Sequence, residues 1–282
     1  MSVTGRILLS AEQLEAGIQN GGCLVVDCRF ELENPDEGRR AWLKGHIPGA
    51  RYAHLDDDLS SPIEPHTGRH PLPSTANFAR FLGRIGWTED RLLIAYDDGP
   101  GAFALRLWWL MRYHAKPAAL LDGGLDAWKA AGGALEAGET ASPSTAVPDL
   151  REDPAMTVDT AELAENLESL TILDARGSER FTGAVEPLDT RAGHIPGALN
   201  RPFGSNLELN GRFRDAEELR EEFDDLFEGK ALGSVVHSCG SGVSACHNLF
   251  AMELAGLAGT RLYPGSWSEW IRNPERPIAT GP

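Results

Sequence analysis

The segment Gly45–Ala50 reads GHIPGA, and the same six letters return at Gly193–Ala198. The residues around the two copies also match, at an offset of 142 to 148 positions. The matching runs are Leu24–Arg29 with Thr171–Arg176 and Leu92–Asp97 with Ser234–Cys239. This period is too long for the stacked units of a solenoid, which span about 20 to 50 residues. The chain is therefore expected to use one type of domain twice.

The spacing of the apolar runs predicts the class of that domain. In the first copy, Cys23–Cys28, Leu92–Asp97 and Ala118–Leu121 have the length and apolar content of buried strands. Between the last two, apolar residues recur with helical spacing from Phe103 to Met111. Alternating strands and helices imply a parallel sheet that is covered on both faces. We therefore expect an α/β protein with two tandem domains, each a mainly parallel sheet flanked by helices.

The expected domains cover residues 1–135 and 156–282. Residues 136–155 between them are rich in Ala, Ser, Thr, Pro and acidic residues, which is typical of a linker. Active groups of such sheets lie beyond the carboxyl ends of the strands. Cys239 and its counterpart Asp97 both follow a strand there. An aspartate supplies no thiol nucleophile, so the first domain is expected to be catalytically silent.

Composition excludes several classes of protein. The 282 residues carry a net charge of −16, which argues against binding nucleic acid or an anionic membrane through a broad basic face. No apolar run approaches the ~20 residues of a membrane-spanning helix, and residues 1–15 lack a signal-peptide pattern. The four cysteines form no Cys-x-x-Cys pair and no zinc-finger spacing. We expect a soluble, cytoplasmic protein with reduced thiols and no metal.

Cys239 is the candidate nucleophile. It follows the apolar run Ser234–Ser238, and a loop of small residues leads from it into a helix expected from Ala245 to about Ala255. Loop N–H groups and a helix N-terminus together stabilise an anionic sulfur. The glycines beside the thiol allow the backbone to approach a bound group closely.

A cysteine loop of this kind suits two chemistries. Phosphatases of the Cys-x5-Arg type hold phosphate with an arginine six residues after the cysteine. That position is Ala245 here, and the loop carries no charge, so the phosphatase hypothesis fails. Sulfur transfer remains, in which the thiolate takes sulfur from a donor as a persulfide and passes it on. This chemistry requires no cofactor, and none is expected.

These motifs together resemble the rhodanese superfamily, and within it the two-domain sulfurtransferases. The resemblance covers nearly the whole chain. It rests on the paired GHIPGA segments, the Cys239 loop, a helix with Trp108-Trp109 and the closing segment Pro264–Trp270. It implies two rhodanese-like domains and an enzyme that transfers sulfur through a persulfide on Cys239.

The resemblance also implies a sulfur donor. Thiosulfate enzymes of the superfamily carry loops like C-R-K-G-V-T, and 3-mercaptopyruvate enzymes carry loops like C-G-S-G-V-T. The loop here is similar to the second, with Ser244 in place of threonine. An uncharged loop suits the single carboxylate of 3-mercaptopyruvate, which would leave as pyruvate. The implied loop residues are Ser241, which is catalytic, and Gly240, Gly242, Val243 and Ser244, which bind the donor.

Residues outside the loop are implied as well. Arg180 of an Arg-Phe pair matches the arginine that binds the donor carboxylate. A second arginine is usual in an E-P-R segment, where this chain has Leu188, and Arg191 is a candidate substitute three residues later. His70 matches the histidine of a Ser-His-Asp relay with Ser241, whose aspartate position falls near His54 with Asp56 close by.

Leu188 keeps the choice of donor open. A thiosulfate:cyanide sulfurtransferase is the alternative enzyme, and a non-enzymatic persulfide carrier or interaction module is an alternative of a different class. The expected partners are a small anionic sulfur donor and an acceptor that is cyanide, a thiol or a thioredoxin-like protein.

Overall fold

The computed structural model describes residues 6–141 and 145–282. They form two compact units. Most of the first half of the chain belongs to the first unit, together with Leu209–Arg212. The second unit contains Pro62–Pro71, Pro154–Glu208 and Phe213–Pro282. The domain limits 1–135 and 156–282 stay a prediction.

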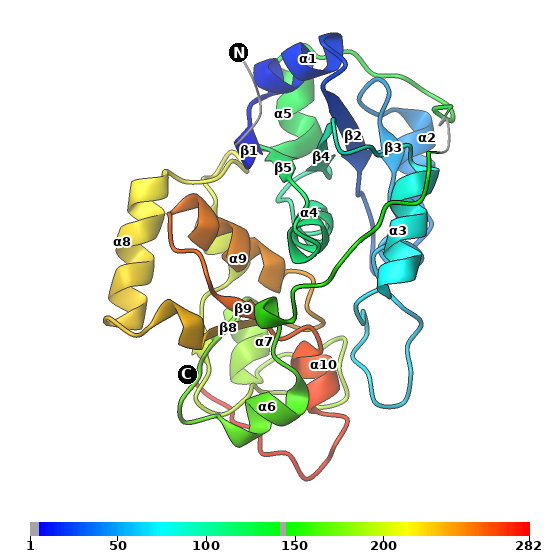
Figure 1. The fold of residues 1–282 in the computed structure, drawn as a ribbon. Coiled ribbons are helices and arrows are strands. Elements are labelled where there is room, and N and C mark those ends of the chain that lie inside the picture. The colour runs from blue at the N-terminus through cyan, green and yellow to red at the C-terminus, as the bar shows by residue number, and fades with distance from the viewer. Residues whose placement is uncertain (1–5, 142–144) are drawn as a thin grey trace. The chain divides into compact units, whose positions relative to one another are not determined.

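The first unit is built on a five-stranded sheet in the order β1-β5-β4-β2-β3 (Figure 1). Its strands are β1 (Leu8–Leu9), β2 (Cys23–Asp27), β3 (Arg51–Tyr52), β4 (Leu92–Tyr96) and β5 (Ala118–Leu121). Every pair of neighbours is parallel, and Val25 lies opposite Ile94. All five residues of β2 are buried, as expected for a central strand covered on both faces.

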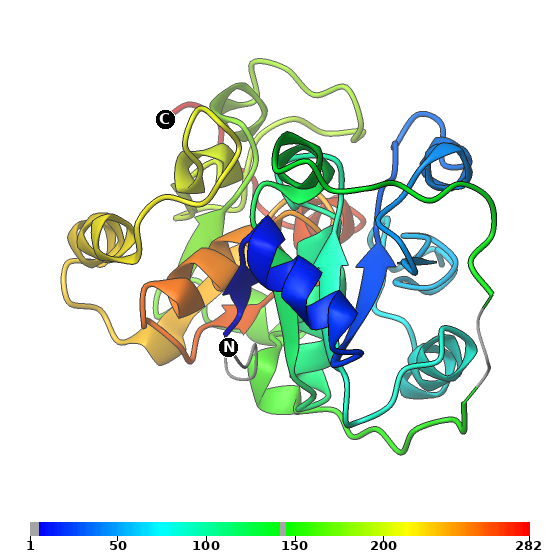
Figure 2. The ribbon, with the colours of Figure 1, turned by 90° about the horizontal axis from the view of Figure 1, so that it is seen from above.

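Helices cover this sheet from both sides. They are α1 (Ala11–Gln19), α2 (Glu37–Lys44), α3 (Thr75–Arg84), α4 (Ala104–Tyr113) and α5 (Gly124–Ala130). Leu14 of α1 and Trp128 of α5 share one apolar cluster with Ile94 of β4, and Figure 2 shows α1, in dark blue, against the strands. The alternate residues Leu93 and Ala95 are buried too, and α4 packs against β4 and β5. Side chains alternate across a strand, so both faces are buried.

The second unit has a four-stranded parallel sheet in the order β7-β6-β8-β9. Its strands are β6 (Thr171–Asp174), β7 (Leu199–Asn200), β8 (Val235–Ser238) and β9 (Arg261–Leu262). Its helices are α6 (Thr160–Glu165), α7 (Ser178–Thr182), α8 (Ala216–Phe227), α9 (Ala245–Leu254) and α10 (Ser266–Trp270). The predicted α/β class with two mainly parallel sheets is therefore confirmed. Within the described ranges, no helix is long and apolar enough to cross a membrane.

The repeat in the sequence is also a repeat of hydrogen bonds. Arg29 binds the carboxylate of Asp27 and donates to the carbonyl oxygen of Gly45 at 2.8 Å. Arg176 binds Asp174 and donates to the carbonyl oxygen of Gly193, also at 2.8 Å. In each unit a buried arginine thus ties the end of one strand to the start of the GHIPGA turn. This part of the repeat is architectural.

Candidate active site

Cys239 is the first residue after β8, and its backbone is held on both sides. Its N–H donates to Ser266 Oγ at 3.0 Å, and its carbonyl oxygen accepts the N–H of Trp267 at 3.0 Å. The turn that presents these groups carries a left-handed residue, since Ser266 has φ of 51°. Cys239 therefore has a defined position at the carboxyl end of the sheet, where α/β proteins place reactive groups.

The sulfur of Cys239 lies in a small buried loop that points a backbone N–H at it. The residue is 1% exposed, and Sγ accepts the N–H of Gly242 at 3.1 Å. Gly242 has φ of +76°, and a Cβ there would lie 2.3 Å from the carbonyl oxygen of Pro264. Val243 is buried, and Ser244 is the cap residue before α9. Only glycine at position 242 lets the chain turn beneath the sulfur and point an N–H at it.

Ser241 and His70 meet beside this loop. The hydroxyl of Ser241 and Nδ1 of His70 are 2.8 Å apart, and both residues are buried. His70 belongs to Pro62–Pro71, which is part of the second unit. This segment packs closely, since a Cβ at Gly68 would lie 2.6 Å from the carbonyl oxygen of Gly265. A serine–histidine pair at this position can move a proton near the sulfur.

Two arginines lie beside Gly240, the residue that follows the cysteine. A Cβ at Gly240 would be 2.8 Å from Nη2 of Arg69 and 3.5 Å from both terminal nitrogens of Arg180. Asp189 bridges them, because Oδ1 binds Nη1 of Arg69 and Oδ2 binds Nη2 of Arg180 at 3.2 Å. Glu186 accepts from Arg180 at 2.8 Å. The expected arginine is thus present, and a second one reaches the loop from a segment far away in the sequence.

These groups form a larger arginine–carboxylate cluster. Its members are Arg69, Arg176, Arg180, Asp174, Glu186 and Asp189. Burial raises the pKa of Glu186, but the hydrogen bonds from Arg180 and from the N–H groups of Leu188 and Asp189 outweigh it, so the pKa lies below its ordinary value. With three cations and three anions the cluster is neutral when all six groups are ionised. It offers arginine contacts to an anion without a surplus of positive charge.

The positions of Leu188 and Arg191 make different contacts. Leu188 is 41% exposed, and its N–H donates to Glu186 Oε1 at 3.0 Å. Arg191 donates from Nη1 to the carbonyl oxygen of Pro274 at 3.4 Å, and its own carbonyl oxygen accepts from Trp267 Nε1. The structure therefore gives Arg191 a structural partner. The second arginine beside Gly240 is Arg69, and the donor-binding role expected of Arg191 stays a prediction.

The sequence did not single out Arg69, Asp189 or Ser266 as site residues. Arg69 precedes the matched His70, and Asp189 follows the unmatched Leu188, so both were adjacent to positions that had been identified. A charged residue next to a motif is a weak signal by itself. Contact between residues 120 positions apart, as for Arg69 and Asp189, is visible only in the structure.

The first unit carries Asp97 at the position equivalent to Cys239. Its carboxylate accepts backbone N–H groups from Gly99 and Gly101 at 3.1 and 2.9 Å, and from Phe103 and Ala104 at 3.1 and 3.3 Å. Burial raises the pKa of Asp97, and the N–H donors oppose that rise. A loop of this geometry thus directs its N–H groups at one anionic group, which here is the chain's own side chain.

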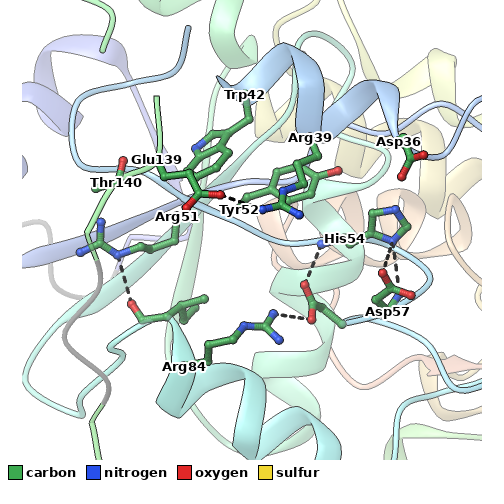
Figure 3. A pocket seen from close by; sticks show the side chains of 12 residues that line it. Asp36, Arg39, Trp42, Arg51, Tyr52, His54, Asp57, Arg84, Glu139 and Thr140 are labelled. Atoms are coloured by element: carbon green, nitrogen blue, oxygen red, sulfur yellow. Dashed lines mark hydrogen bonds and ion pairs between the residues drawn. The ribbon is translucent and has the colours of Figure 1, made fainter. Parts of the chain in front are cut away.

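A separate cavity of about 460 Å³ lies in the first unit at the edge strand β3, between α2 and the end of α3 (Figure 3). Its charged side chains pair with one another, as Arg39 does with Glu139 at 2.8 Å and Arg84 with Asp58 at 2.5 Å. A second cavity, of about 440 Å³, lies at the equivalent edge strand β7 beside α8. Both copies of the fold have such a space, so we interpret it as a consequence of the architecture. His54, near which the relay aspartate is expected, lines the first of these cavities, whereas Cys239 and the residues expected to bind the donor do not.

Comparison with known proteins agrees with this architecture. The rhodanese-like domain family matches residues 10–131 and 159–273. A probable 3-mercaptopyruvate sulfurtransferase from Pseudomonas aeruginosa is 50% identical over 281 residues, with 97% of this chain and 98% of the relative covered. A putative thiosulfate sulfurtransferase from Mycobacterium tuberculosis is 39% identical, with 100% and 99% covered.

A solved structure extends the likeness to three dimensions. The 3-mercaptopyruvate sulfurtransferase from Leishmania major superimposes with a TM-score of 0.84 at 33% identity, over 96% of this chain and 76% of that one. The chain therefore belongs to the rhodanese family, as a two-domain member, and is an enzyme of the sulfurtransferase type.

Proposed function

We propose that this enzyme takes sulfur from 3-mercaptopyruvate, releases pyruvate and passes the sulfur to a thiophilic acceptor through a persulfide on Cys239. The thiolate of Cys239 attacks the donor sulfur while the bond from that sulfur to carbon breaks. The bonding electrons leave with carbon as the enolate of pyruvate. The enolate takes up one proton, and the donor thiol gives one up. Attack by the acceptor on the outer sulfur then returns the electrons of the S–S bond to Cys239.

The environment of the Cys239 sulfur carries this proposal. Sγ is buried, it accepts the N–H of Gly242 at 3.1 Å, and the loop between Cys239 and Ser244 has no charged residue. A neutral loop suits a donor with one carboxylate better than it suits a dianion. Ser241 and His70, 2.8 Å apart, are the pair that would relay the proton of the donor thiol.

The first unit supports a role for the other loop residues. Gly99 and Gly101, whose N–H groups bind the carboxylate of Asp97, correspond to Ser241 and Val243 at the offset of 142. We expect the N–H groups of Ser241 and Val243 to bind the outer sulfur of the persulfide in the same way. Asp97 occupies its own loop, so we propose that the first unit takes no sulfur.

A comparison of donors tests the proposal. We expect kcat/KM for 3-mercaptopyruvate, followed by pyruvate release, to exceed that for thiosulfate, with cyanide as the acceptor in both assays. Thiosulfate:cyanide transfer is the second candidate, supported by the Mycobacterium tuberculosis relative named for thiosulfate. Equal or better turnover with thiosulfate in the same preparation would contradict the proposed donor and favour this alternative.

The persulfide is tested separately. Cys239→Ser should abolish transfer with either donor, whereas Cys246→Ser, which alters another buried thiol of the same unit, should retain it. The intact mass of the wild-type protein should rise by one sulfur atom after donor treatment without acceptor, and that of Cys239→Ser should not. A gain in the Cys239→Ser variant would exclude Cys239 as the carrier. A loaded protein that never turns over would favour a persulfide carrier over an enzyme.

A further inference from the structure

Asp189 binds both of the arginines that lie beside the Cys239 loop. Its side chain is 4% exposed, and its two carboxylate oxygens bind separate guanidinium groups, those of Arg69 and Arg180. Its own N–H donates to Glu186 Oε1 at 3.1 Å, which fixes the backbone of the turn that carries it. An internal carboxylate thus already satisfies the arginines that an external carboxylate needs.

Arg69 reaches this cluster because its segment, which belongs to the second unit, forms hydrogen bonds with other parts of that unit. The N–H of Arg69 donates to Ser268 Oγ at 3.0 Å, and the carbonyl oxygen of Thr67 accepts from Arg272 Nε at 3.0 Å. Both guanidinium groups border the space at Gly240, where a Cβ would contact their nitrogens. The bridge through Asp189 therefore lies next to the residue that follows the nucleophile.

We propose that Asp189 sets the charge of the donor by competing for Arg69 and Arg180, so that the site accepts a monoanion and discriminates against a dianion. This inference rests on the proposed function and adds the residue that determines its specificity. Asp189 acts through the two arginines and is a positioning residue; it takes no part in bond making.

The argument is electrostatic. When all six groups are ionised and no donor is bound, the charges of the three arginines and three carboxylates sum to zero. A bound monocarboxylate leaves it with one excess negative charge, and thiosulfate leaves it with two. Repulsion between like charges grows with their product and is strong a few ångströms apart in a partly buried site. Neutralising Asp189 should therefore help both anions but help the dianion more.

Equilibrium binding to Cys239→Ser protein tests this without any turnover. Pyruvate serves as the monoanion probe and thiosulfate as the dianion probe, and calorimetry measures the dissociation constants. Adding Asp189→Asn should tighten thiosulfate binding by about tenfold and pyruvate binding by a smaller factor. Asp189→Glu retains the charge and should leave the ratio of the two constants near that of the parent. Asp225→Asn, an equal change of charge at an exposed position of α8, should also leave it unchanged.

A second variant covers the case in which Asp189→Asn does not fold. Arg69→Gln removes a cation from the same bridge and should weaken both probes, thiosulfate more than pyruvate. The inference is overturned if the ratio of the dissociation constants of thiosulfate and pyruvate is unchanged in Asp189→Asn. If Asp189→Asn does not fold, the same ratio is measured in Arg69→Gln, and an unchanged value there overturns the inference. A wild-type enzyme that prefers thiosulfate in turnover refutes the proposed donor, while the ratio of binding constants still decides the role of Asp189.

Discussion

Replacing Gly242 by alanine tests whether the loop that holds Cys239 depends on its backbone geometry. Gly242 has φ of +76°, in the left-handed region, and a Cβ there would lie 2.3 Å from the carbonyl oxygen of Pro264 and 3.0 Å from its carbonyl carbon and Cα. These are backbone atoms, which cannot swing aside as a side chain can. The same residue donates the N–H that reaches Cys239 Sγ. One methyl group therefore strains the turn and moves the donor.

The magnitude follows from these two effects. The left-handed conformation costs an alanine about 1 kcal/mol more than a glycine, and overpacking against fixed atoms costs about 1–3 kcal/mol. We expect the free energy of unfolding of the second unit to fall by about 3 kcal/mol, which lowers its thermal midpoint by about 10 °C. Turnover should fall as well, because a displaced Gly242 no longer stabilises the thiolate.

Gly240→Ala is the matched control, two positions earlier in the same loop. Its φ is not in the left-handed region, and its Cβ would meet the ends of Arg69 and Arg180 instead of backbone. The guanidinium groups can move, so we expect little loss of stability but a raised KM for the donor. Differential scanning calorimetry and donor kinetics on both variants separate the two effects. A Gly242→Ala midpoint within about 1 °C of the wild type would refute the argument from strain.

The surroundings of Ser241, Asp97 and His237 each support one further prediction. Ser241→Ala removes the hydroxyl bound to His70. It should lower kcat with 3-mercaptopyruvate by about a hundredfold and lower kcat with thiosulfate by less. An equal loss with both donors would contradict a role of Ser241 in moving the thiol proton. Asp97→Ala leaves four backbone N–H groups without their acceptor and should destabilise the first unit by about 3 kcal/mol while Cys239 still loads with sulfur, as calorimetry and intact mass would show. Burial lowers the pKa of His237 from 6.5 to about 3. Between these two pH values the unfolded state binds one proton that the folded state does not bind, so the free energy of unfolding falls as the pH drops below 6.5. Urea unfolding between pH 5 and 8 should show this loss, about 1.4 kcal/mol per pH unit below 6.5, and His237→Gln should reduce the slope; an unchanged slope would mean that His237 is protonated in the fold.

Local patterns predicted the parts of the site that lie within one segment of the chain. The strand before Cys239 and the helix after it were expected at Ser234–Ser238 and from Ala245, and they occur at β8 and α9. Burial of a strand and periodicity of a helix are properties of neighbouring residues, so a sequence displays them. The small loop between them could be recognised for the same reason.

Contacts between distant segments were harder to predict. Arg191 is near Leu188 in the sequence and is therefore the candidate second arginine, and in the structure its guanidinium donates to the carbonyl oxygen of Pro274. The arginine that contacts Gly240 is Arg69, which comes from a segment packed on the second unit through Gly68 and Ser268. Sequence distance carries no information about which of two arginines a fold brings to a given loop.

The amino-acid sequence is enough to predict that one domain type is used twice, that its sheets are parallel, and that Cys239 ends a strand in a loop suited to an anionic sulfur. Each of these follows from spacing, composition or a repeated motif along the chain. The packing of distant segments is needed to bring Arg69 and Arg180 together at Gly240, to place Asp189 between them, and to bring Ser241 to His70. The physical reason is that charge balance at a site is set by the groups that packing brings within a few ångströms, whatever their distance in the sequence.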